Sequence, residues 1–128
     1  MSAIILSALC LGSCAWLMDT FGEEQDIGPI TWDRTAEDWS DNEYAAYKVT
    51  LPAGGSEYDI WGTDIYTDDS PIGTAAVHAG LITFADGGTV KMQILPGYDS
   101  YEGSLRNGVG SENFGAWGAS YKFVDADD

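Results

Sequence analysis

The stretch from Trp61 to Ile82 constrains the fold more than any other part of the chain, because a clear helix-start signal precedes an uncharged segment. Ser70 can cap the helix, and Pro71 suits the first helical position, where its missing N–H leaves no hydrogen bond unmade. Positions 74–82 carry no formal charge. A helix without a polar face is a buried helix. We therefore expect a buried helix over about residues 71–82.

Val77 and Leu81 share one face of this expected helix, and His78 and Ile82 share the neighbouring face. We expect the helix to be the central element of the domain, with mostly short β-strands in irregular sheets around it. The predicted fold class is therefore α+β. The residues predicted to have structural roles in this stretch are Trp61, Ser70, Pro71, Val77, His78 and Leu81.

Length and composition favour a single domain made of short strands. A chain of 128 residues can bury a core without disulfides or metal ions, and its 16 glycines and 12% aromatic residues favour tight turns over long helices. The predicted domain covers residues 30–124, followed by an acidic tail at 125–128. Strands are expected at 30–33, 44–51, 58–61, 89–95 and 119–124, one helical turn at 35–39, and an ordered loop, rich in Gly, Ser and Tyr, at 97–118.

The net charge of −16 restricts the partners of the chain. Nucleic acid is excluded because phosphate binding needs a basic surface, and anionic membranes would repel such a protein. Residues 19–69 hold fourteen acidic against two basic residues, a net charge of −12. This segment is either a solvated acidic face or a surface for cations or a basic partner.

Residues 3–18 form the only long apolar run, and both cysteines lie within it. We expect residues 1–18 to be an export signal, a retained anchor or an assembly segment, followed by an acidic linker over 19–29. The sequence Leu-Gly-Ser-Cys ending at Cys14 resembles a bacterial lipoprotein processing box, which makes this cysteine a lipidation candidate. The spacing of Cys10 and Cys14 does not match a redox motif. The predicted location is extracytoplasmic: secreted, periplasmic, or attached to a membrane through residues 1–18.

Two blocks of sequence carry specific motifs. The first block runs from Trp-Gly-Thr-Asp-Ile-Tyr-Thr-Asp-Asp-Ser at 61–70 through Ala-Ala-Val-His-Ala-Gly at 75–80. The second includes Tyr-Glu-Gly-Ser at 101–104 and Arg-Asn-Gly-Val at 106–109. Together these blocks resemble the LCCL domain, an extracellular module that also occurs in bacteria, and the resemblance covers about residues 30–123. It implies a central helix wrapped by irregular sheets, and polysaccharide or lipopolysaccharide-type ligands.

The chain departs from the family at two positions. Relatives usually carry cysteines just before the Pro-Gly turn and just before the helix, where this chain has Leu51 and Gly73. The resemblance implies that these positions form a disulfide pair in relatives and that both cysteines were lost together.

Two groups of residues are candidates for metal or acid–base chemistry. His78 is the only histidine, and a hydrogen-bonded core histidine is the favoured interpretation because no second histidine or available cysteine accompanies it. Asp64, Asp68 and Asp69 are candidate ligands for Ca²⁺, which prefers several oxygen donors, but they also suit turns and helix capping. No other cofactor is expected.

The loop at 97–118 holds the binding candidates. Aromatic, Asn and Arg side chains supply flat apolar faces and directed hydrogen bonds for sugars or peptides. Alternatively, Arg106 satisfies an internal carboxylate or loop carbonyls, and Asn107 forms a turn with Gly108. The predicted ligand-binding residues are Tyr98, Tyr101, Arg106, Asn107 and Trp117.

No nucleophile–base motif, zinc-protease motif or phosphate loop is present in the sequence, so we expect no enzyme. The favoured function is a non-catalytic extracellular binding and interaction module. The alternative is a structural or accessory subunit of a membrane complex, or of a homopolymeric surface assembly, held through its apolar N-terminus. The expected partners are other protein subunits, further copies of the chain, or envelope glycans.

Overall fold

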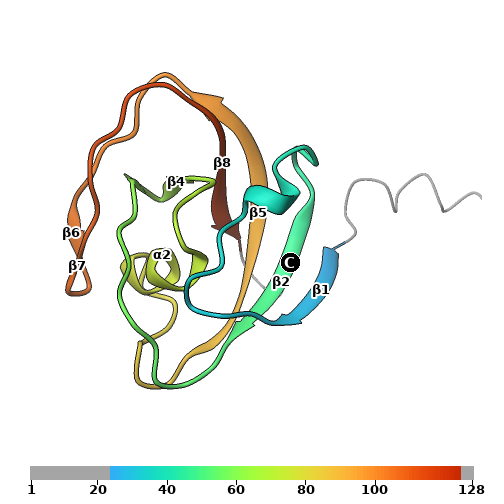
Figure 1. Cartoon of the computed structure of the whole chain (residues 1–128), viewed down its shortest axis with the longest axis vertical. Helices are drawn as coiled ribbons and strands as arrows, with labels where there is room; N and C mark the ends of the chain where they lie inside the picture. The colour runs from blue at the N-terminus through green and yellow to red at the C-terminus, as the bar shows by residue number, and fades with distance from the viewer. Residues whose placement is uncertain (1–23, 125–128) are drawn as a thin grey trace, which may run out of the picture.

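A computed structural model of the chain describes residues 24–124, which form a six-stranded sheet, a separate two-stranded hairpin and one short α-helix (Figure 1). The order of strands in the large sheet is β1-β2-β5-β8-β4-β3. The bounds of the elements are β1 Glu24–Pro29, η1 Glu37–Trp39, β2 Ala46–Leu51, β3 Gly62–Thr63, β4 Ile65–Thr67, α2 Ile72–His78, β5 Gly88–Tyr98, β6 Leu105–Arg106, β7 Val109–Gly110 and β8 Trp117–Val124. The fold is therefore α+β and mostly β.

The β2–β5–β8 ladder is the longest regular part of the sheet. β2 pairs antiparallel with β5, which in turn pairs antiparallel with β8 from Lys91↔Val124 to Tyr98↔Trp117. Alternation along β2 buries Tyr47, Val49 and Leu51 while the residues between them are half-buried. The alternation therefore predicted β2 correctly, and β5 begins one residue before the predicted strand and runs three residues beyond it.

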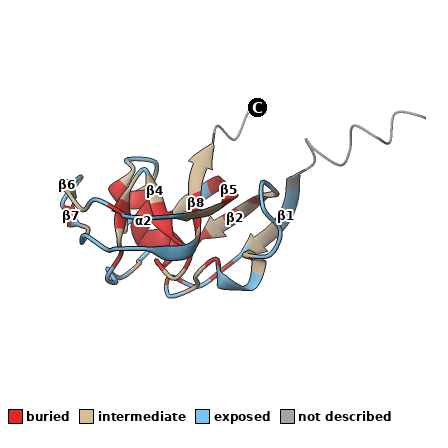
Figure 2. Ribbon diagram, turned by 90° about the horizontal axis from the view of Figure 1, so that it is seen from above, coloured by how far each residue is buried: buried red, intermediate tan, exposed pale blue. Residues whose placement is uncertain are grey.

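The helix is shorter than predicted. α2 has seven residues, all of them buried, and lies between the large sheet and the β6–β7 hairpin (Figures 1 and 2). It ends because Gly80 adopts φ +86°, and the N–H groups of Gly80 and Leu81 donate to the carbonyls of Val77 and Ala76. This pair of bonds is the Schellman stop, which favours glycine at the left-handed position. Leu81 lies beyond the helix and is 51% exposed, so its predicted core role is wrong.

The helix start also differs from the prediction. Pro71 is the N-cap residue rather than the first helical residue, and no side chain caps the helix. The buried Ser70 hydroxyl instead accepts a hydrogen bond of 3.0 Å from the Trp61 backbone N–H and contacts the Thr67 hydroxyl at 2.9 Å. Ser70 therefore joins the end of β4, at Thr67, to the residue that precedes β3, Trp61.

Three other predicted segments differ. The expected linker is wrong from Glu24 onward, because Glu24–Pro29 forms β1, parallel to β2. The expected strand at 30–33 is absent, although Ile30 donates a backbone bond to Thr50. The expected strand at 58–61 is reduced to a bridge between Trp61 and Glu112. The predicted Cys14 lipidation site and segment 1–18 lie outside the described residues.

Leu51 and Gly73 are neighbours in the core. A Cβ atom placed on Gly73 would lie 3.0 Å from Leu51 Cδ1 and 2.4 Å from Cε3 of the Trp32 indole. The Trp32 ring is buried, and its Nε1–H donates to the Pro52 carbonyl at 2.8 Å. Trp32 therefore packs beside the two positions that the family resemblance predicts to be cysteines in relatives.

Candidate functional site

Tyr98 and Trp117 form a cross-strand aromatic pair at the end of the β5–β8 ladder. Their side chains are 41% and 36% exposed. The two strands approach closely here, because a Cβ atom on the adjacent Gly97 would lie 2.0 Å from the Trp117 carbonyl oxygen. Only glycine fits this approach, so Gly97 sets the geometry of the pair.

A buried carboxylate fixes the indole of Trp117. Its Nε1–H donates a hydrogen bond of 2.7 Å to Asp68 Oδ1, and the Ser40 hydroxyl donates to the other carboxylate oxygen. Asp68 is almost fully buried, so these two donors replace the water that its charge would otherwise bind. The Trp117 ring is thus held in one orientation without any ligand.

The buried Tyr101 side chain packs behind Tyr98 and Trp117 and bonds to the backbone of both. Its buried hydroxyl accepts a hydrogen bond of 3.1 Å from the Tyr98 backbone N–H and donates one of 3.3 Å to the Trp117 carbonyl. Its ring meets the Tyr98 ring edge-on, with centroids 6.1 Å apart. The structure therefore brings together three of the five predicted binding residues, and gives Tyr101 a supporting role.

Two hollows adjoin Tyr98. The first has a volume of about 420 Å³ and is lined by Gly97, Tyr98, Asp99, Ala116, Trp117 and Gly118. The second has a volume of about 170 Å³ and is lined by Thr63, Ile65, Tyr98, Ser100, Tyr101 and Glu102. Asp99 and Glu102 were not among the predicted site residues, although both flank predicted tyrosines in the sequence.

Arg106 and Asn107 lie on the β6–β7 hairpin and are occupied by internal contacts. The Arg106 guanidinium donates to both oxygens of Asp64, at 2.7 and 3.3 Å. The Asn107 amide donates to the His78 carbonyl at 2.9 Å, and Asn107 adopts φ +52° in the turn before Gly108. Both residues hold the hairpin against the β3–β4 corner and α2, as the alternative interpretation expected, although the Asp64 carboxylate is exposed rather than internal. Neither lines the two hollows beside Tyr98.

His78 is a buried structural residue between α2 and the hairpin segment. Its Nε2 lies 3.1 Å from the Ser104 carbonyl oxygen, and its Nδ1 lies 2.9 Å from the Tyr66 hydroxyl. Because a carbonyl can only accept, the His78 Nε2–H donates to Ser104, and the Tyr66 hydroxyl is bonded to Nδ1. Burial raises the pKa of Tyr66 to about 12, which keeps this donor protonated.

The three candidate Ca²⁺ ligands are not gathered into one site. Asp64 pairs with Arg106, and Asp68 accepts from Trp117 and Ser40. Between residues 24 and 124, no group of three or more His, Cys, Asp or Glu side chains is placed to hold a metal ion.

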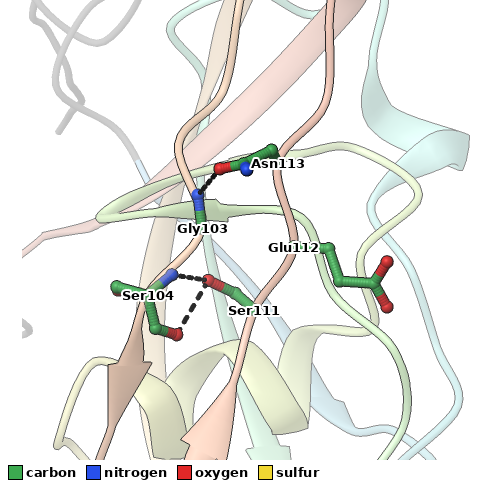
Figure 3. Close-up of a pocket in the computed structure, with 5 residues that line it drawn as sticks. All are labelled: Gly103, Ser104, Ser111, Glu112 and Asn113. Carbon is green, nitrogen blue, oxygen red and sulfur yellow. Dashed lines mark hydrogen bonds between the residues drawn. The ribbon is translucent and has the colours of Figure 1, made fainter.

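A further hollow of about 480 Å³ lies between the two segments that lead into and out of the β6–β7 hairpin (Figure 3). Its polar groups bond to one another: the Ser104 N–H donates to Ser111 Oγ at 2.9 Å, and the Gly103 N–H donates to Asn113 Oδ1 at 2.8 Å. Glu112 points away from these contacts in Figure 3. This hollow offers no aromatic face, so the Tyr98–Trp117 pair is the stronger candidate.

The sequence is similar to known proteins. The LCCL domain family matches residues 30–121. The chain belongs to the LCCL domain family. Cochlin from Homo sapiens is 32% identical over 123 residues, which cover 94% of this chain and 22% of cochlin. Vitrin from Homo sapiens is 36% identical over 80 residues, covering 61% of this chain and 12% of vitrin.

Cysteine-rich secretory protein LCCL domain-containing 2 from Homo sapiens is 48% identical over 56 residues, which cover 44% of this chain and 11% of that protein. The chain thus spans between a tenth and a quarter of the length of these relatives. Cochlin and vitrin are extracellular proteins in which the LCCL domain is a non-enzymatic module. The LCCL family was therefore identified correctly from the sequence.

Within the described part of the chain, no helix has the length and apolar character needed to cross a membrane.

Proposed function

We propose that this chain is a non-catalytic extracellular binding module that holds a polysaccharide-type ligand against Tyr98 and Trp117. The observation that carries the proposal is the orientation of Trp117, which Asp68 fixes while a third of its surface stays exposed. A ring fixed before binding loses little conformational entropy on binding, so its contact area contributes more to affinity. Membership of an extracellular domain family supports the location of this function.

The site has the composition that carbohydrate recognition requires. A flat aromatic face covers the apolar side of a sugar ring, while carboxylates and hydroxyls bond its hydroxyl groups. Here the face comes from Tyr98 and Trp117, and the polar groups come from Asp99, Ser100 and Glu102. The volume of the first hollow, about 420 Å³, falls in the range typical of small-ligand sites.

A glycan array tests the proposal, with the full chain, Tyr98→Ala and Tyr58→Ala as probes. Tyr58 is a matched control because it is also 41% exposed but does not line either hollow beside Tyr98. We expect the full chain and Tyr58→Ala to bind the same glycans and Tyr98→Ala to lose them. Glycan binding that is equal in all three proteins would contradict the assignment of this site.

The second candidate is a structural or accessory subunit held by its apolar N-terminus, and the apolar run at 3–18 favours it. Sedimentation of the full chain against a variant lacking residues 1–19 tests this function. We expect a larger assembly only for the full chain if the apolar run mediates association. Monomers in both cases would remove the support for this function.

A further inference from the structure

We infer that the ligand is a neutral glycan of at least two sugar units that lies across Tyr98, an inference that rests on the proposed function. Tyr98 lines both the hollow beside Trp117 and the hollow beside Glu102. A ligand that fills both must therefore lie against Tyr98. A single sugar fills one hollow and leaves the other empty, so affinity increases with the length of the glycan.

The charge of the two hollows excludes an anionic ligand. Neither is lined by Lys or Arg, and each holds one exposed carboxylate, Asp99 or Glu102. No residue in the described range 24–124 makes a hydrogen bond or ion pair to either carboxylate. Arg106, on the nearby hairpin, is already paired with Asp64. Sulfate, phosphate or uronate groups would meet repulsion here, whereas the hydroxyls of a neutral sugar donate hydrogen bonds to carboxylates.

The distribution of charge favours a glycan over a basic peptide. The hollows lie mostly in the part of the chain from residue 70 to 124, which holds four acidic against three basic residues, a net charge of −1. The acidic residues are concentrated at 19–69, with a net charge of −12. Thr63 and Ile65 of the acidic segment line only the second hollow, and Asp68 is already bonded to Trp117 and Ser40, so Asp99 and Glu102 supply the charge at the hollows. Two separated carboxylates beside flat rings instead match the alternating apolar faces and hydroxyls of a sugar chain.

Titration calorimetry on the full chain at physiological salt tests this inference. The probes are neutral tetrasaccharides of glucose, mannose and N-acetylglucosamine, their monosaccharides, tetragalacturonate as the anionic probe, and tetralysine as the basic peptide. We expect at least one neutral tetrasaccharide to bind, with its monosaccharide about tenfold weaker or more. Tyr98→Ala should weaken the tetrasaccharide about tenfold, while Tyr58→Ala leaves it unchanged.

Asp99→Asn and Glu102→Gln separate charge from shape, because both variants keep an oxygen acceptor. Each should weaken a neutral tetrasaccharide about fivefold, since hydrogen bonds to a charged acceptor are stronger than those to an amide. If tetragalacturonate binds through Tyr98 and no neutral glycan does, the inferred ligand class is wrong and the proposed function stands. If only tetralysine binds, both the inference and the proposed function fail. A monosaccharide that binds as tightly as the tetrasaccharide would overturn the extended site. If no probe and no arrayed glycan binds, the proposed function fails as well.

Discussion

Trp117 and Asp68 are 49 residues apart in the chain, yet the Trp117 indole N–H donates a hydrogen bond of 2.7 Å to the Asp68 carboxylate. Through Asp68 the indole is tied to the corner after β4 and, through Ser40, to the turn that follows η1. The candidate binding face is therefore held by three segments that meet only in the folded chain.

Removing this carboxylate should affect both stability and binding. Asp68→Ala leaves the indole N–H and the Ser40 hydroxyl without their acceptor, and we expect a loss of about 2 kcal/mol in the free energy of unfolding. Urea unfolding measures this loss. Asp59→Ala, at an exposed aspartate, should change the free energy by less than about 0.5 kcal/mol. Equal effects of the two variants would show that Asp68 does not hold the indole.

A side chain at Gly73 should destabilise the fold by displacing Trp32, although alanine favours helix formation. A Cβ atom there would lie 2.4 Å from the Trp32 indole, so we expect Gly73→Ala to destabilise the fold by about 1–3 kcal/mol. Gly110→Ala is the control, because a Cβ atom on Gly110 meets nothing within 4 Å. Thermal unfolding of both variants checks the difference. A Gly73→Ala protein as stable as the unmodified chain would show that Trp32 has room to move.

Positions 51 and 73, which the family resemblance implies to be a disulfide pair in relatives, should accept a disulfide in this chain. Leu51 and Gly73 adjoin, so oxidised Leu51→Cys/Gly73→Cys should form the bond after a small shift of Trp32. A loop of this length should add about 3 kcal/mol of stability relative to the reduced variant. Peptide mapping under non-reducing conditions detects the crosslink, with Leu51→Cys alone as control. Free thiols at both positions after oxidation would contradict the proposed pairing.

Stability should decrease at high pH because of the buried tyrosines. The pKa of Tyr66 is raised by burial to about 12, and burial also raises that of Tyr121, whereas an unfolded tyrosine titrates near 10. The contribution of the protonated Tyr66 hydroxyl to the free energy of unfolding is therefore fully present below pH 10. It is lost as the pH rises from about 10 to 12. Denaturant midpoints at pH 8, 10 and 11 measure this loss.

Tyr66→Phe should reduce this pH dependence, because phenylalanine does not titrate. The same variant loses the hydrogen bond to His78, so its stability at pH 8 should also be lower. Tyr58→Phe, at an exposed tyrosine, should leave the profile unchanged. An identical pH profile for Tyr66→Phe would show that Tyr66 is not the titrating group.

Local patterns in the sequence predicted the regular strands of the sheet but not where the helix α2 ends. Alternating burial in Tyr47, Val49 and Leu51 is a property of β2 itself, so the sequence shows it directly. The predicted helix to residue 82 is too long because a glycine such as Gly80 fits both a buried helix and the left-handed position that ends one. Its left-handed conformation and the two Schellman bonds end the helix at this point.

The candidate site depends on contacts between distant residues. Tyr98 and Trp117 could be identified as aromatic residues in a glycine-rich loop, but their pairing follows from the β5–β8 register. Arg106 could be identified as a charged loop residue, whereas its partner Asp64 lies 42 residues away. Sequence spacing does not separate a ligand-binding arginine from one that fixes a hairpin, so only the fold decides between them.

The most direct test of the proposed binding site is an NMR titration of the indole N–H signals with a neutral tetrasaccharide. The chain has five tryptophans, and Trp117→Phe assigns the signal of Trp117. We predict that this signal shifts saturably with added tetrasaccharide, while that of the buried Trp32 stays in place. A glycan that binds the chain without shifting the Trp117 signal would contradict the Tyr98–Trp117 site.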